Sequence, residues 1–135
     1  MLVVTKEGLR IFMRAVLAAW PTLTLRLFVN DIDPTEETVL SDVTQATFPG
    51  YEPIVIMSWT NPYQVEDATN VETDEQPRLF TQSYPADPVQ TVYGYMVTSP
   101  WPHLLWAERA ATPIAMLGVN QMVTVRPSLT LRNQT

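Results

Sequence analysis

The hydrophobic positions at the start of the chain follow the period of a helix. Within Thr5–Trp20, apolar residues recur at i, i+3, i+4, i+7, i+8 and i+11 and form one stripe: Leu9, Phe12, Met13, Val16, Leu17 and Trp20. Thr5 suits the N-cap, and Pro21 cannot continue a helix. We therefore expect an amphipathic helix packed by this stripe, rather than a signal peptide.

After Pro21 the period changes to two, which is typical of strands. Thr22–Asn30 places four apolar residues on one face and polar residues on the other; the apolar ones are Leu23, Leu25, Leu27 and Val29. Phe28 interrupts the polar face. We interpret Phe28 as an exposed contact residue.

The stretch Thr91–Arg109 predicts two strands joined by a stiff turn. Thr91–Thr98 is rich in β-branched and aromatic residues and has no polar face, so we expect it to be covered on both sides. Ser99–Pro102 contains two prolines and ends this strand. His103–Arg109 then runs back, and its polar end, Glu108 and Arg109, is interpreted as the exit to solvent.

The remaining segments predict shorter elements. Strands are expected at Ile54–Trp59, Arg78–Ser83 and Gln121–Arg132. Ser41 and Asp42 can cap a single helical turn that runs through Ala46. Ala110–Asn120 is expected to be a loop. Thr60–Gln76 is either an exposed loop or a weak edge hairpin, and Pro127 confines the last strand to an edge or a bulge.

These elements together predict a mainly β fold. The connections are too short for crossover helices, which favours an antiparallel β-sandwich or flattened barrel of about six or seven strands. We expect one domain over residues 1–135, with the N-terminal helix (1–21) packed on the sandwich (22–135).

Composition narrows the classes of function. The chain has 135 residues and a net charge of −6, which argues against nucleic acid or an anionic membrane as its main partner. It has no cysteine, so disulfides, zinc–thiolate sites and thiol nucleophiles are excluded. Its longest early apolar run, Ile11–Trp20, is interrupted by Arg14 and is too short to span a membrane.

The residues that carry chemistry do not form a catalytic or cofactor motif. His103 is the only histidine and is expected at a strand end, because no serine lies in a nucleophile-elbow pattern. Asp31–Glu37 is acidic but fails the EF-hand spacing, which leaves a solvated loop or a non-EF calcium site as alternatives. We expect no enzyme activity, cofactor or resident metal.

Two surfaces are candidates for contacts with proteins. Lys6, Arg10 and Arg14 share one helix face, which is either a solvated face or a docking strip for an acidic partner. Trp101 lies between two prolines, and an exposed tryptophan on rigid backbone is a good interface anchor. Five aromatic residues form either a ligand platform or part of the core: Trp59, Tyr93, Tyr95, Trp101 and Trp106.

Over nearly its full length the chain resembles a group of small tailed-bacteriophage proteins encoded among virion structural genes. The motifs that carry the resemblance are Leu25–Asn30, Thr38–Asp42 after Pro34, Ala46–Tyr51, Val92–Thr98, Leu104–Arg109 and Val123–Leu131. The chain departs from this group at Ser99–Pro102, where relatives carry a polar, glycine-containing turn.

The resemblance implies a virion component that is assembled in the host cytoplasm. The first expectation is a capsid cement or decoration protein that binds the major capsid protein and associates symmetrically with itself. A tail, neck or fibre-associated protein is the alternative, and a carbohydrate-binding module is a further one. Neither nucleic acid nor membrane is expected as a partner. The candidate interface residues are Lys6, Arg10, Arg14, Phe28 and Trp101.

Overall fold

The computed structural model describes residues 5–19, 22–57, 59, 63–65, 68–72 and 77–132. Helix α1 spans Lys6–Ala19, as the hydrophobic period predicts. The backbone N–H of Gly8 donates to Thr5 Oγ1 at 3.0 Å, so Thr5 is the N-cap. The predicted end of the helix at Trp20 and Pro21 lies outside the described residues.

A four-stranded antiparallel sheet forms the centre of the fold. Its strands are ordered β2 (Ile54–Ile56), β1 (Leu23–Phe28), β6 (Thr91–Thr98) and β7 (Leu104–Ala115). The alternate leucines of β1, Leu23, Leu25 and Leu27, are all fully buried. In β6 the residues from Gly94 to Thr98 are buried on both faces, which confirms the prediction for this strand.

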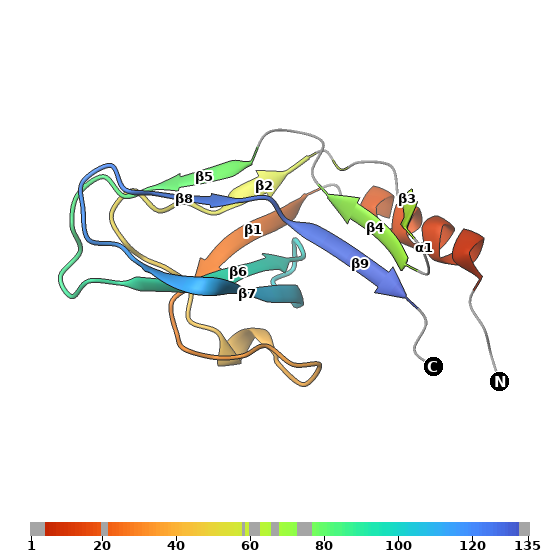
Figure 1. Ribbon diagram of the computed structural model, residues 1–135, viewed down its shortest axis with the longest axis horizontal. Coiled ribbons are helices and arrows are strands. Elements are labelled where there is room, and N and C mark those ends of the chain that lie inside the picture. The colour runs from red at the N-terminus through yellow and green to blue at the C-terminus, as the bar shows by residue number, and fades with distance from the viewer. Residues whose placement is uncertain are drawn as a thin grey trace.

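Two smaller antiparallel sheets complete the described fold. One contains β3 (Tyr63–Val65), β4 (Ala68–Glu72) and β9 (Ser128–Arg132), and the other contains β5 (Arg78–Thr81) and β8 (Met122–Val125). Figure 1 shows β5 and β8 over β6 and β7, with β3, β4 and β9 beside α1 at one end. The predicted fold class is confirmed as mainly β, antiparallel and sandwich-like, and the described strands do not close into a barrel.

The described strands number nine, more than the six or seven expected, for two reasons. Tyr63–Val65 and Ala68–Glu72 form the hairpin that the sequence left as an alternative. The predicted final strand, Gln121–Arg132, is divided at Pro127. Because proline has no N–H to donate, pairing stops there; β8 pairs with β5, and β9 pairs with β4 in a different sheet.

Two local expectations were wrong. Ala110–Asn120 is not a loop throughout, because β7 continues to Ala115 and Ile114 pairs with Val92. The neighbouring pair in the register is Arg109 with Gly94. Between the two pairs β7 covers five positions and β6 only two, so the extra residues of β7 form a large bulge. The second wrong expectation is the helical turn through Ala46, because the helical turn lies earlier, as a 3-10 helix at Leu40–Asp42. Asp42 Oδ2 accepts the Val39 N–H at 3.0 Å.

Phe28 is fully buried, so the interpretation of it as an exposed contact residue was also wrong. It lies opposite Gly94 in the register between β1 and β6. A Cβ atom on Gly94 would lie 2.6 Å from Phe28 Cζ, which shows that the aromatic ring fills the space beside the glycine. Phe28 is therefore removed from the candidate interface.

Candidate functional site

The turn between β6 and β7 presents Trp101 to solvent. Trp101 is 68% exposed, which confirms the exposure predicted from its two flanking prolines. Beneath it, the Ser99 N–H donates to the His103 carbonyl at 3.1 Å, and the His103 N–H donates to Ser99 Oγ at 3.2 Å. The Ser99 hydroxyl in turn donates to the Trp101 carbonyl. These bonds hold the backbone of the tip, defined here as residues 99–103, in one conformation.

His103 lies directly before β7, at the strand end where it was predicted. Its Nδ1 is 2.7 Å from the Trp101 carbonyl oxygen. A carbonyl only accepts, so Nδ1 carries the proton in this contact. The hydroxyl of Ser99 is used within the same turn, so these two side chains stabilise the tip.

The basic residues of α1 are described in part. Arg10 and Arg14 are exposed, whereas the side chain of Lys6 is not among those that the structure describes. Within the described part of the chain, neither arginine has an ion-pair partner. Both therefore stay available for a contact outside the molecule.

The apolar stripe of α1 is only partly buried. Leu9 and Met13 are buried and Leu17 packs against the core, whereas Phe12 and Val16, expected in the same buried stripe, are exposed. A small apolar hollow remains between these helix residues, Trp106 and Leu129. The rest of the fold therefore covers a narrower face of the helix than the sequence period predicts.

The acidic loop after β1 forms ion pairs with Arg109 of β7. Arg109 Nη1 lies 2.6 Å from Asp31 Oδ1, and Arg109 Nε lies 3.5 Å from Asp33 Oδ1. Arg109 Nη1 also donates to the Ile32 carbonyl at 2.9 Å, and its guanidinium lies 5.3 Å from the centre of the Tyr93 ring. Hydrogen bonding to Asp31 raises the pKa of Arg109.

This ion-pair cluster bears directly on the calcium alternative. Two carboxylates that would have to ligate a cation are engaged by Arg109 instead. Among the described residues, no group of three or more acidic or histidine side chains gathers as a metal site. Arg109 itself was interpreted as part of an exit to solvent, and this was wrong, because β7 continues beyond it.

Tyr95 joins three strands at one point. Its hydroxyl donates to Glu108 Oε2 at 2.7 Å and accepts the Ser128 N–H at 3.4 Å. Burial, followed by the hydrogen bond to Glu108, raises the pKa of Tyr95 to about 12. Tyr95 therefore stays protonated at neutral pH and ties β6 to β7 and to the start of β9.

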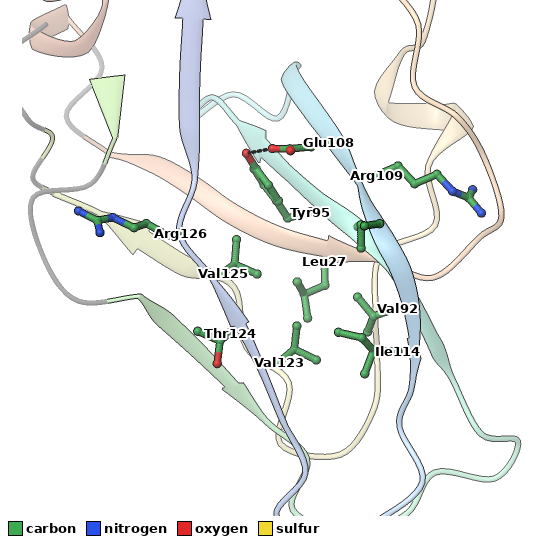
Figure 2. A pocket seen from close by; sticks show the side chains of 13 residues that line it. Leu27, Val92, Tyr95, Glu108, Arg109, Ile114, Val123, Thr124, Val125 and Arg126 are labelled. Carbon is green, nitrogen blue, oxygen red and sulfur yellow. Dashed lines mark hydrogen bonds between the residues drawn. The ribbon is translucent and has the colours of Figure 1, made fainter. Parts of the chain in front are cut away.

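A cavity of about 250 Å³ lies next to this tyrosine, between β6, β7 and β8. Figure 2 shows that five apolar side chains of its lining gather toward one another: Leu27, Val92, Ile114, Val123 and Val125. Arg109 and Arg126 belong to the lining, but Figure 2 shows both pointing away from this group. The lining includes Leu27 of β1 and Val92 of β6, so one side of the cavity is the four-stranded sheet and the other side is β8. Sequence patterns did not predict it, because it depends on how two separate sheets pack against each other.

The aromatic residues do not form a shared platform. Trp59 and Trp106 are partly buried and pack edge to face, with ring centroids 5.8 Å apart. Tyr95 is buried, and Tyr93 is covered in part by Arg109. Of the five aromatic residues considered, Trp101 is the one that is exposed. The core interpretation therefore holds for Trp59, Tyr95 and Trp106, whereas Tyr93 is partly exposed beside Arg109.

No family model, curated protein or solved structure matches this chain. The resemblance to tailed-bacteriophage virion proteins therefore stays a prediction from the sequence. None of the described helices has the length and apolar character needed to cross a bilayer.

Proposed function

We propose that this protein is a structural subunit that acts by binding other protein subunits through the tip at residues 99–103. Following the sequence resemblance, we place it in the virion of a tailed bacteriophage. There it acts as a capsid cement or decoration protein that stabilises the shell of major capsid protein. The resemblance supports the virion setting, and the tip supports the mode of binding.

The exposure of Trp101 is the observation that carries the binding mode. A tryptophan that is 68% exposed offers a large apolar surface to a partner. Its backbone is already held by Ser99 and His103. A pre-organised anchor loses little conformational entropy on binding, which is the property of residues that dominate interface energies.

The same observations bear on the two alternative functions. A tail, neck or fibre-associated protein would use the same tip, so the location in the particle separates it from a capsid protein. A carbohydrate-binding module needs an exposed aromatic platform, and Trp59 and Trp106 are instead packed against each other. The protein-binding proposal is therefore favoured over the carbohydrate-binding one.

The experiment is cryo-electron microscopy of particles assembled with wild-type protein, with Trp101→Ala and with Leu117→Ala. Leu117 is the matched control, because it is 66% exposed and lies beyond the opposite end of β7. We expect wild type and Leu117→Ala to occupy sites across the shell and Trp101→Ala to lose most of its occupancy. Equal occupancy of all three would overturn the role of the tip.

The same maps test the virion setting. Density confined to one vertex or to the tail would replace the capsid proposal with the tail alternative. Absence of the wild-type protein from particles would overturn both virion proposals.

A further inference from the structure

Helix α1 is apolar on two sides, and the fold covers only one of them. Leu9, Met13 and Leu17 recur every four residues and face the sheets. On the outer side Ile11 is 57% exposed and Phe12 is 58% exposed. Ala15, Ala18 and Ala19 on this outer face are also apolar and exposed, whereas Val16, like Phe12, borders the hollow beside Trp106 and Leu129. A solvent-facing helix surface normally carries polar residues, so this face is a candidate contact surface.

The charges beside this outer face have a definite order. Glu7 and Arg14 are two helical turns apart and therefore lie on the same edge of the face. Both are exposed, and neither has an ion-pair partner among the described residues. Arg10 lies about 40–60° further round the helix from these two residues, on the side away from Ile11 and outside the contact face. The edge itself is thus negative near the start of the helix and positive further along. A complementary surface must present the opposite order.

A second copy of the same helix, running antiparallel, presents that order. A two-fold axis in the contact plane and perpendicular to the helices reverses their direction while keeping their matching edges on the same side. If the axis passes near Ile11, Glu7 of each copy lies opposite Arg14 of the other. The two ion pairs are then formed symmetrically. The small side chains of Ala15 and Ala18 allow the two helix backbones to approach closely.

We propose that two copies of this chain associate through the outer faces of α1, antiparallel, with the two-fold axis close to Ile11. Figure 1 places α1 at one end of the molecule, where a second copy can reach it without passing the sheets. The proposal does not depend on the virion setting, because it concerns the isolated chain.

The size of the contact sets the expected strength. A helix of 14 residues is about 21 Å long, and its single face offers less than the roughly 800 Å² per partner of a standard interface. The dimer is therefore weak and reversible. We expect a dissociation constant on the order of 10–100 µM, which weakens further as salt screens the paired charges.

Sedimentation equilibrium of the purified full-length chain tests the charge pairing. In Glu7→Arg a positive residue 7 faces Arg14 of the other copy, and in Arg14→Glu a negative residue 14 faces Glu7 of the other copy. Each single variant should therefore weaken the dimer about tenfold. The combined Glu7→Arg, Arg14→Glu variant restores opposite charges and should return to within about threefold of wild type. A wild type that is monomeric up to about 1 mM, or a double variant no better than the single ones, overturns the proposal.

A cross-linking experiment tests the position of the axis. The chain has no cysteine, so a single introduced thiol reports one contact. Under mild oxidation Ile11→Cys should give a covalent dimer, because the two copies of residue 11 lie close to each other across the axis. The matched control, Leu117→Cys, is on another exposed surface and should stay monomeric. Equal cross-linking of both variants would show random collision and overturn the proposed register.

Discussion

The ring of Phe28 occupies the space that a side chain on Gly94 would need. The two residues are register partners across β1 and β6, and Phe28 Cζ is 2.6 Å from the position of a Cβ on Gly94. The Glu108 carbonyl of β7 approaches the same position from the other neighbouring strand. Gly94 therefore allows an aromatic ring to pack closely against β6.

Replacing Gly94 with alanine should destabilise the fold by about 1–3 kcal/mol, because the new methyl group would clash with both the Phe28 ring and the Glu108 carbonyl of β7. Urea unfolding at neutral pH measures the loss. Gly118→Ala is the matched control, since no atom lies within 4 Å of a Cβ there, and it should change stability by less than about 0.5 kcal/mol. In a Phe28→Leu background the cost of Gly94→Ala should fall, and equal costs in both backgrounds would contradict the packing argument.

Tyr95 should make stability depend on alkaline pH. Its pKa is raised to about 12 in the folded protein, against about 10 when unfolded. The unfolded chain therefore loses this proton first, so the stabilisation is complete below pH 10 and is lost as pH rises from about 10 to about 12. Comparing wild type with Tyr95→Phe by urea unfolding across this range isolates the contribution, because other groups titrate equally in both. A constant difference between the two proteins would contradict the shifted pKa.

Arg109 should hold the acidic loop on the sheet. Arg109→Ala removes the ion pairs to Asp31 and Asp33 and the hydrogen bond to the Ile32 carbonyl. We expect amide hydrogen exchange to accelerate around Asp31–Asp33 while the amides of β1 keep their protection. Arg10→Ala, which removes an exposed arginine without an ion pair among the described residues, is the control and should leave the loop unchanged. Equal exchange in the two variants would show that the loop does not depend on Arg109.

Fluorescence should separate Trp101 from the packed tryptophans. Trp101 is 68% exposed, whereas Trp106 is partly buried against Trp59. The emission removed by Trp101→Phe should be red-shifted and readily quenched by acrylamide, because this indole contacts water. The emission removed by Trp106→Phe should be shifted to the blue and quenched less. The reverse result would contradict the assignment of Trp101 as the exposed aromatic residue.

Local patterns determined much of the fold from the sequence alone. The helix from Lys6 to Ala19, the buried leucines of β1 and the central position of β6 follow from residue spacing that each element carries within itself. The exposed tip at Trp101 follows from its flanking prolines. These features need no knowledge of which segments meet.

The tertiary structure decided the features that depend on strand pairing. Phe28 appears on a polar face in the sequence, yet it is buried where β1 pairs with β6 at Gly94. Arg109 reaches Asp31 because β7 continues beside a loop that lies far away in the sequence. Pro127 indicates an interruption of the last strand. That the chain pairs with β5 before this proline and with β4 after it depends on the edges that those strands leave open. Side-chain period reports which face of a strand is apolar, whereas register and partner are set by contacts between distant segments.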